Sequence, residues 1–362
     1  MDIELYLKER RSHVEQQSQR VKDFSVFDFN YVPERPLMRE ECKDLVDAML
    51  RFEATGIPTN MAIVGSRGSG KTLTLRYLQR LIPGQTALEV LYANCRHHNT
   101  SYKILTHLLS APTAGSSLSQ LFDRFVEDRE AKAVMVLDEV DLMSPKDKRR
   151  EILYLLSRSE KPFMVIMLSN SPHVLKQLDA ATRSSLQPVP LHFRDYNAEE
   201  VRTILRDRAA LGLHDFDAAH LAEISAMTTR LTNSDARVAI KTLFYQVTTP
   251  EESVTDAFER ARRDIVVDMI GNLSDGNLMI LWAAATEKSG LAKDVYARYC
   301  RYSQDHGEKP FSYVYFYSNL SYLQSMGLIG LASAKVGRTY TYRLQLAFDA
   351  TVVTSLCRLR FA

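Results

Sequence analysis

The sequence lacks any apolar run that could cross a membrane. Its longest apolar runs, at residues 163–168 and 278–285, are far shorter than the roughly 20 residues that span a bilayer. Cysteine is also scarce, and no Cys-x-x-Cys pair is formed by the four that are present, which are Cys42, Cys95, Cys300 and Cys357. This spacing excludes a disulfide scaffold and is typical of reduced thiols in the cytosol. The first residues lack the basic start and apolar stretch of a secretory signal. We therefore expect a cytoplasmic protein.

The composition is that of an ordinary globular chain. Hydrophobic residues make up 45% and charged residues 25% of the 362 residues, which excludes collagen-like, coiled-coil and wholly disordered proteins. The length predicts two or three domains. A formal net charge of +2 hides an uneven distribution, because residues 271–362 contain ten basic and six acidic side chains. A polyanionic partner would therefore favour the C-terminal part.

Short apolar runs alternate with helical patterns in the first half of the chain, as is typical of a parallel sheet covered by helices on both faces. We expect strands at residues 61–64, 87–93, 133–137 and 163–168. Helices are expected at residues 40–52, 71–81, 101–109, 118–128 and 148–157. Residues 24–193 are thus predicted to form an α/β nucleotide-binding base domain, preceded by an N-terminal extension at residues 1–23.

After Phe193 the pattern becomes helical. Asn197 and Glu200 have the three-residue spacing of a helix N-cap and its reciprocal partner, and we expect an all-α domain over residues 194–270. Residues 271–362 form a third region, with expected helices at 278–287, 292–302 and 312–326 and expected strands at 328–332 and 339–346. Helices followed by a hairpin with a basic tip predict a winged-helix domain.

The strongest motif is GSRGSGKT at residues 65–72, which follows an apolar strand and begins a helix. The glycines of such a P-loop let backbone N–H groups turn towards phosphate oxygens. Lys71 supplies a point charge to the β- and γ-phosphates, and the Thr72 hydroxyl is a ligand for Mg²⁺. The motif therefore predicts a nucleoside triphosphate site.

Three further positions complete the predicted site. Asp138 ends an apolar strand and would hold the Mg²⁺ shell, while Glu139 is placed to orient or deprotonate an attacking water. Asn170 ends the next strand and either hydrogen-bonds the γ-phosphate or the attacking water, or caps its own turn. Arg237, near the start of a helix in the all-α domain, either reaches back to the phosphates or is solvated.

At this point the sequence resembles the AAA+ ATPases, and among them the archaeal replication initiators related to the eukaryotic origin recognition complex and its helicase-loader partner. The resemblance extends from about Phe24 over nearly the whole chain. It is carried by YVPER at 31–35, GSRGSGKT at 65–72, LDEVD at 137–141, LSN at 168–170, DAATRSSL at 179–186, YNAEEV at 196–201, SDAR at 234–237 and the terminal winged helix.

The resemblance implies a role for each matched position. Lys71 and Thr72 become Walker A residues, Asp138 and Glu139 Walker B residues, Asn170 sensor 1 and Arg237 sensor 2. The further residues implied to contact ATP or ADP are Gly68, Ser69, Gly70, Leu73, Tyr196 and Arg208. Tyr196 and Arg208 can equally be a packing aromatic and a solvated arginine.

One motif departs from the family pattern. Relatives often carry DPRVKSSL where this chain has DAATRSSL, so that Arg183 replaces a lysine and Ala181 an arginine. Two interpretations stay open: Arg183 serves as an arginine finger towards a neighbouring subunit, or the chain stimulates a partner's hydrolysis poorly.

The resemblance places a DNA-recognition helix at residues 312–323, which contain no charged side chain. Ser312, Tyr313 and Asn319 would then hydrogen-bond DNA, with Val314, Leu320 and Leu323 facing the core. Lys335 and Arg338 at the hairpin tip are better placed for phosphate or minor-groove contact. The alternatives are an aromatic-rich core helix and a tip that is basic only for solubility. Family members also touch DNA through an inserted motif, in the region that corresponds to residues 111–117.

The combined features favour an ATP-regulated initiator that binds double-stranded DNA at replication origins. The resemblance adds slow ATP hydrolysis as a switch with Mg²⁺, assistance in loading the replicative helicase, association with paralogous initiator subunits and a place on the nucleoid. A P-loop ATPase that regulates transcription through its winged helix is the first alternative, and a transposition helper ATPase is the second.

Overall fold

The chain folds into two compact units, Met1–Ala257 and Phe258–Ala362, each of which is considered by itself. The computed structural model describes residues 2–4, 7, 11, 20–109, 115–144, 147, 150–171, 174–336 and 339–361. Within these residues no helix has both the length and the apolar character that a membrane span requires.

The described part of the first unit contains a five-stranded parallel sheet with the strand order β2-β3-β4-β1-β5. Its strands are β1 (Met61–Gly65), β2 (Glu89–Asn94), β3 (Ala133–Asp138), β4 (Phe163–Ser169) and β5 (Val189–Phe193). The parallel sheet and its first four strands confirm the prediction. The prediction missed β5, an edge strand that is largely exposed and carries Pro190, because such a strand has neither a continuous apolar run nor a full set of backbone donors.

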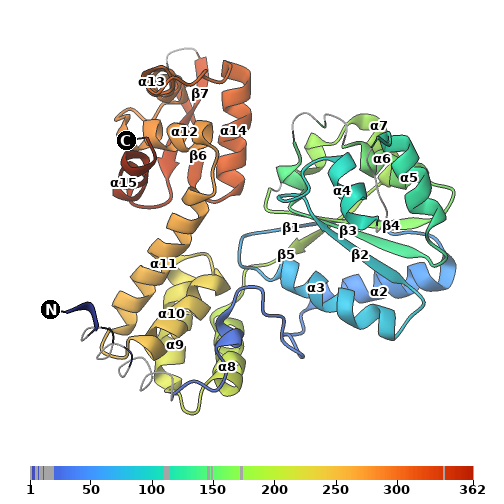
Figure 1. Cartoon of the computed structure of the whole chain (residues 1–362), viewed down its shortest axis with the longest axis horizontal. Coiled ribbons are helices and arrows are strands. Elements are labelled where there is room, and N and C mark those ends of the chain that lie inside the picture. Colours follow the sequence, from blue (N-terminus) through green and yellow to red (C-terminus); the bar gives the residue numbers. More distant parts are fainter. Residues whose placement is uncertain are drawn as a thin grey trace. The chain divides into compact units, whose positions relative to one another are not determined.

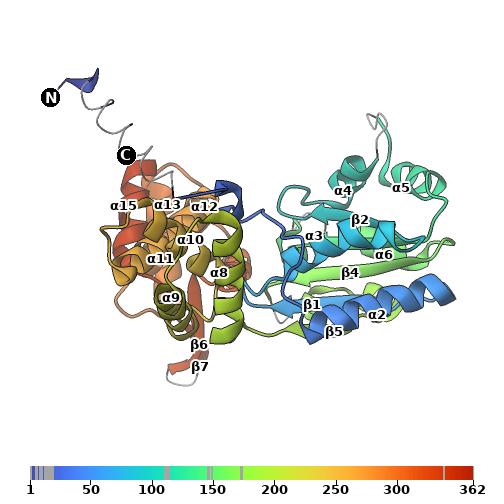
Figure 2. The same cartoon turned by 90° about the horizontal axis from the view of Figure 1, so that it is seen from below.

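Helices cover both faces of the sheet, as predicted (Figure 1). One face packs against α4 (Ser101–Leu108), α5 (Leu118–Glu127), α6 (Glu151–Arg158) and α7 (Ala180–Leu186), and the other against α2 (Glu40–Thr55) and α3 (Lys71–Leu81). Figure 2 shows α2 and α3 on the near side of the sheet. Because both faces are covered, every residue of β3 and β4 is buried.

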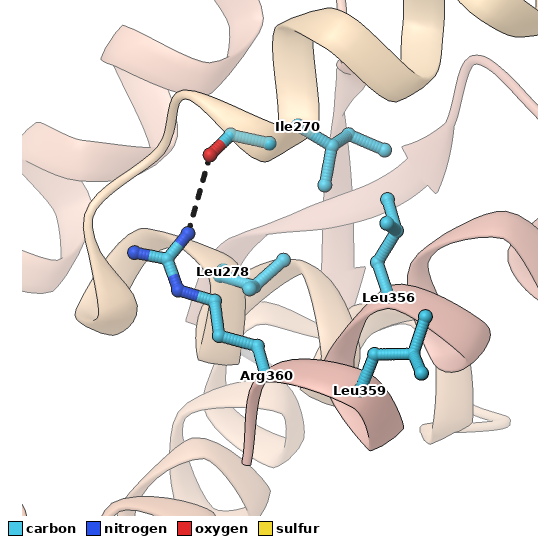
Figure 3. Close-up of a pocket in the computed structure, with 6 residues that line it drawn as sticks. Ile270, Leu278, Leu356, Leu359 and Arg360 are labelled. Carbon is cyan, nitrogen blue, oxygen red and sulfur yellow. Dashed lines mark hydrogen bonds between the residues drawn. The ribbon is translucent and has the colours of Figure 1, made fainter.

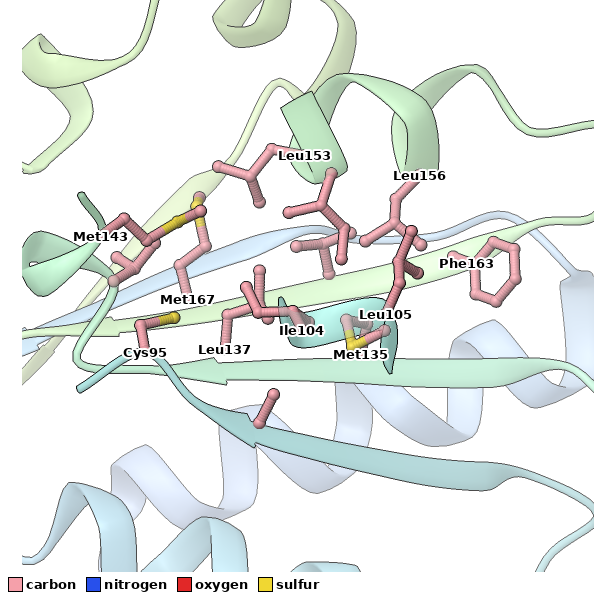
Figure 4. Close-up of a cluster of buried hydrophobic side chains, with 14 of the residues drawn as sticks. Cys95, Ile104, Leu105, Met135, Leu137, Met143, Leu153, Leu156, Phe163 and Met167 are labelled. Atoms are coloured by element: carbon pink, nitrogen blue, oxygen red, sulfur yellow. The ribbon is translucent and has the colours of Figure 1, made fainter. Parts of the chain in front are cut away.

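The core under α4 to α6 is a single apolar cluster (Figure 4). Met135, Leu137 and Met167 of the strands meet Ile104 and Leu153 of the covering helices. Helix α6 begins at Glu151, after the predicted start at 148, because Arg150 has the left-handed backbone of a non-helical cap (φ 46°). Short 3-10 turns connect the elements at η2 (Ile82–Gly84), η3 (Val140–Leu142) and η4 (Val174–Gln177).

The remaining helices of the first unit form a separate cluster, here called the lid: α8 (Ala198–Gly212), α9 (Ala218–Leu231) and α10 (Ala236–Thr248). The predicted Asn197–Glu200 pair is confirmed as a capping box at the start of α8. The 3-10 turn η1 (Phe24–Phe27) packs on the lid through Val26 and Phe27. The predicted base domain included this turn, but its apolar side chains complete the lid core instead.

The second unit has its own apolar core. Helix α11 (Val254–Gly271) begins in the first unit and continues into the second, so the unit boundary lies inside this helix and not at residue 270 as predicted. Next come α12 (Asp275–Thr286), α13 (Ala292–Asp305), α14 (Tyr313–Ser325), the antiparallel pair β6 (Ile329–Val336) and β7 (Thr339–Leu346), and α15 (Ala350–Arg360). The predicted helices and hairpin are therefore present. The prediction missed α15, whose threonines and valines have weak helix propensity and which buries Val352, Val353 and Cys357.

A small pocket opens between α11, α12 and α15 (Figure 3). Ile270, Leu278, Leu356 and Leu359 give it apolar walls. Arg360 at its edge donates to the Gly271 carbonyl (3.3 Å) and pairs with Asp275 (2.7 Å). The arginine thereby ties the last helix of the unit to its first two.

Phe125 should be a principal contributor to the stability of the first unit. It is 0% exposed and stacks on Phe163 with ring centroids 5.6 Å apart. We expect Phe125→Ala to lower the free energy of unfolding by about 3–5 kcal/mol. Circular dichroism in urea measures this loss, and Phe29→Ala, at a side chain 48% exposed, is the matched control.

The single tryptophan, Trp282, lies in the second unit. Its fluorescence transition should therefore stay in place in Phe125→Ala. The assignment of Phe125 to the core of the first unit would be contradicted if Phe29→Ala lost as much unfolding free energy as Phe125→Ala. It would also be contradicted if the tryptophan transition shifted as much as the circular dichroism transition in Phe125→Ala.

Candidate functional site

The P-loop joins β1 to α3 through glycines in the left-handed region. Gly68 has φ 74° and Gly70 has φ 88°, a conformation that side chains with a Cβ avoid. A Cβ on Gly68 would clash with Asp235, and one on Gly70 with the Tyr196 hydroxyl. Ser69 between them is buried and donates from its Oγ to the Ser66 carbonyl (2.8 Å). Glycine is thus required here both for the turn and for the close approach of the lid.

Lys71, the first residue of α3, is a cation held almost out of water. It is 6% exposed, and its Nζ donates to the carbonyls of Gly65 (2.8 Å) and Ser66 (2.7 Å). Burial lowers the pKa of Lys71 to about 8, against the opposing effect of Asp138 and Asp141. Such a charge is suited to an anionic ligand, because bound phosphates would restore the solvation that burial removes.

Asn170 follows β4 and meets the same ammonium group. Its Oδ1 accepts from Lys71 Nζ at 3.0 Å. The parallel pairing of β1 with β4 brings the two strand ends together, so that the P-loop lysine and the asparagine share one edge of the sheet. The Leu73 side chain, in the first turn of α3, is half-buried.

Asp138 at the end of β3 lies beside the first turn of α3. Its Oδ2 accepts from the Thr72 hydroxyl (2.8 Å) and from the Tyr92 hydroxyl (2.7 Å), and its Oδ1 accepts from the Glu139 N–H (2.8 Å). Burial raises the pKa of Asp138, although the hydrogen bonds from Tyr92 and Thr72 act in the opposite direction. A hydroxyl and a carboxylate side by side are the oxygen ligands that Mg²⁺ prefers.

Glu139 has a left-handed backbone (φ 52°) and a firm side-chain partner. Arg96 holds both of its carboxylate oxygens, with Nε to Oε2 at 2.9 Å and Nη2 to Oε1 at 3.0 Å. Burial acts to raise the pKa of Glu139, but Arg96, together with Arg67 and Asn94, outweighs it and the net pKa is lowered. The carboxylate is therefore ionised, as a base requires. Sequence reasoning missed Arg96, although it follows β2, the strand whose Asn94 is in register with Asp138.

The lid reaches the P-loop through Arg237 and Asp235. The Arg237 guanidinium binds Asp235 with two hydrogen bonds, and Asp235 lies against Gly68. The charge of Arg237 contributes, after burial, to lowering the pKa of Arg67 to about 10, and it also acts on Lys71. Cations from both base domain and lid therefore lie around the loop, and the charge of Arg237 disfavours the protonated forms of Arg67 and Lys71.

Tyr196 and Arg208, both predicted to line the nucleotide, lie in different places. The Tyr196 hydroxyl is at Gly70, and burial raises the pKa of this tyrosine to about 12. Arg208 instead donates to the carbonyls of Val26 and Tyr31 and lies over the Tyr31 ring at 4.5 Å. These contacts tie Arg208 to the N-terminal segment, and its contact with a nucleotide stays a prediction.

Arg39 is a buried link that sequence reasoning missed. Its side chain donates to the carbonyls of Ser69 in the P-loop (3.2 Å) and of Arg194 before the lid (2.8 Å). It also pairs with Glu41 (3.3 Å) and with Glu200 of α8 (3.6 Å). One residue thus connects the P-loop to the first lid helix. Its only sequence signal was its position at the start of α2, directly after the proline-containing loop.

The residues predicted to bind DNA are only partly at the surface of the second unit. Ser312 caps α14, and Tyr313 is 44% exposed. Asn319 is 8% exposed and donates to the Tyr315 carbonyl one turn earlier. Its amide is therefore turned away from solvent, contrary to the prediction that it contacts DNA. Val314, predicted to be a core residue, is 78% exposed because Phe316 takes the inward position.

Three remaining predictions concern exposed or undescribed positions. Lys335 on β6 is exposed, and Arg338 lies outside the described residues. Arg183 is exposed on α7. Of residues 111–117, only 115–117 are described, and there Ser117 caps α5.

Comparison with known proteins agrees with this geometry. Residues 58–178 match the AAA domain family. The ORC1-type DNA replication protein of Thermoplasma volcanium is 25% identical over 350 residues, covering 87% of this chain and 86% of that protein. ORC1-type DNA replication protein 1 of Sulfolobus acidocaldarius is 29% identical over 280 residues, with 70% of each chain covered.

Among solved structures, the Aeropyrum pernix ORC1 protein in complex with DNA superposes with a TM-score of 0.72. The alignment covers 95% of this chain and 98% of that one at 22% identity, so it bears on the fold. Residues 58–178 therefore match an AAA domain, and the chain is similar over most of its length to the archaeal ORC1-type DNA replication proteins.

Proposed function

We propose that this chain is an ATP-regulated replication initiator that binds double-stranded DNA at origins and assists in loading the replicative helicase. The observation that carries the proposal is the group of crowded cations at the P-loop. Arg67 and Lys71 come from the base domain and Arg237 from the lid; burial is the main cause that lowers the pKa of Arg67 and Lys71, and the charge of Arg237 lowers both further. A triphosphate would neutralise this group, which couples nucleotide occupancy to the contact between base domain and lid.

The proposed switch uses residues that already touch one another. Asp235 lies at Gly68 and Tyr196 at Gly70, while Arg39 spans from Ser69 to Arg194 and Glu200. Phosphates bound to the P-loop amides would draw Lys71 away from its carbonyl partners and compete with Asp235 for Arg237. Nucleotide binding would thus change the lid contacts and, through α11, bias the DNA-binding unit.

Hydrolysis is assigned to Glu139 as the base and Asn170 as the group that orients the attacking water. Thr72 and Asp138 would hold Mg²⁺, which supplies charge neutralisation to the β- and γ-phosphates. The bidentate hold of Arg96 on Glu139 occupies the base, and we therefore assign slow turnover, suited to a timing switch.

The DNA role rests on the relatives and on charge. The named relatives are replication proteins, and the structure of the A. pernix protein was determined in complex with DNA. Residues 271–362 of this chain carry an excess of basic side chains. Helicase loading, paralogous initiator subunits and a place on the nucleoid in the cytoplasm belong to the same proposal.

DNase footprinting over genomic fragments tests the proposed role. We expect protection of repeats at a replication origin, with a pattern that differs between ATP and ADP. Protection confined to scattered promoters would favour a transcription regulator and contradict the proposal.

Lys71→Ala should separate nucleotide binding from DNA binding. Loss of the only P-loop ammonium should weaken ATP binding by about 100-fold, or about 2.8 kcal/mol, while DNA affinity changes little. Isothermal titration and fluorescence anisotropy measure the two affinities. Lys43→Ala is the matched control, because Lys43 forms only an exposed pair with Glu40. A parallel loss of both affinities in Lys71→Ala would contradict the division.

Glu139→Gln should lower the steady-state rate of ATP hydrolysis by about 100-fold or more, the usual contribution of a general base. ATP affinity should remain near that of the wild type, since the glutamine side chain keeps the size of the glutamate and one hydrogen-bonding oxygen. Phosphate release and equilibrium titration provide the two numbers. Unchanged turnover would remove Glu139 from the catalytic role.

A further inference from the structure

The turn that precedes α10 in the lid is strained, and it ends in an acidic residue. Asn233 and Ser234 both have left-handed backbones, with φ 51° and 60°, a conformation that costs energy in residues other than glycine. Ser234 is buried, so the packing around the turn holds it in this conformation. The residue that the turn positions is Asp235, which caps α10 by accepting from the Arg237 N–H (3.0 Å).

Asp235 lies directly against the P-loop. A Cβ on Gly68 would be only 2.1 Å from the Asp235 Oδ1 and 2.8 Å from the Asp235 Cα, so the carboxylate and the backbone of the turn both touch this glycine. Just before the lid, Asp195 accepts a hydrogen bond from the Ser66 hydroxyl. Two carboxylates from the lid side therefore contact a loop whose backbone amides are suited to an anion.

The carboxylate of Asp235 also neutralises a cation that a phosphate would otherwise contact. Its Oδ1 accepts from Arg237 Nε at 2.9 Å, and its Oδ2 accepts from Arg237 Nη2. Burial is the main cause that lowers the pKa of Lys71 to about 8, and the charge of Arg237 lowers it further. When no nucleotide is bound, Asp235 thus balances part of the positive charge at the loop, as a phosphate would.

Helix capping alone does not explain where Asp235 lies. Asp217 caps α9 in the same way, because its Oδ1 accepts from the N–H two residues later (2.7 Å). The Asp217 side chain is nevertheless 56% exposed, whereas that of Asp235 is 13% exposed and touches Gly68. The burial of Asp235 and its contact with the loop therefore need a further reason.

We infer that Asp235 is an internal anion that competes with phosphate for the P-loop and for Arg237, and so limits the affinity for ATP. An arriving triphosphate takes Arg237 from Asp235 and, because like charges repel, displaces the carboxylate from Gly68. Part of the binding free energy of the phosphates is used for this exchange. The inference rests on the proposed function in that the P-loop binds ATP, and it adds the residue that opposes this binding.

Isothermal titration of the full chain with ATP and Mg²⁺ tests the inference. Asp235→Asn removes the charge but keeps the size and the helix cap, since asparagine caps as well as aspartate. It should raise the affinity for ATP by about 10-fold, because a like charge leaves the phosphate site. Asp235→Ser, which also keeps a capping oxygen, should act in the same direction. Asp217→Asn makes the matched change at the cap of α9 and should leave the affinity unchanged.

The stability of the nucleotide-free chain separates competition from a merely structural role. An internal anion stabilises the free protein, so Asp235→Asn should lower the melting temperature without nucleotide by about 2–4 °C while it raises the affinity for ATP. Asp217→Asn should change neither quantity. A residue that only positioned Arg237 for the phosphates, or only supported the lid, would lower the stability and the affinity together.

The outcomes keep this inference apart from the function on which it rests. An affinity for ATP that falls or stays the same in both Asp235 variants would overturn the inference, even if the wild type binds ATP and DNA. A chain that binds ATP in neither wild-type nor variant form would remove the nucleotide site of the proposed function as well. Binding of ATP without binding of DNA would remove only the DNA role.

Discussion

The buried ammonium of Lys71 is the constraint on which the nucleotide site depends. Its Nζ is held by the carbonyls of Gly65 and Ser66 and by Asn170, which positions it without an anionic partner in direct contact. This requires β1 and β4 to be adjacent and parallel, so that the P-loop and Asn170 meet at one edge. The sheet topology therefore creates the unsatisfied positive potential that a triphosphate needs.

Arg39 extends this constraint to the lid. It is 7% exposed, bonds the Ser69 carbonyl of the loop, and reaches Arg194 and Glu200 at the start of α8. Its guanidinium also lies 4.6 Å from the centre of the Tyr196 ring. A planar group with five donors can serve several acceptors at once, which a lysine cannot do. Movement of the P-loop backbone would thus be transmitted to the lid through the side chain of Arg39.

Much of the site could be predicted from local sequence. Lys71 and Thr72 begin the helix that follows the loop after β1, and Asp138 ends β3. The carboxyl ends of parallel strands share an edge of the sheet, so predicting four of the five strands was enough to predict that these residues meet. Arg39 and Arg96 could not be predicted in the same way. Nothing in the residues around them indicates that each contacts a group more than 25 positions away in the chain.

The sequence by itself determined the alternation of strands and helices, the P-loop and the capping box of α8, because these depend on periodicity and on residues within a few positions of one another. Only the tertiary structure decided that Asn319 is buried, that Val314 is exposed and that Arg208 binds the N-terminal segment. The physical reason is that the outward face of a helix, and the partner of a long side chain, depend on what packs beside that helix. Residues from distant parts of the chain determine which side chains are buried, and the local sequence pattern does not indicate where those residues pack.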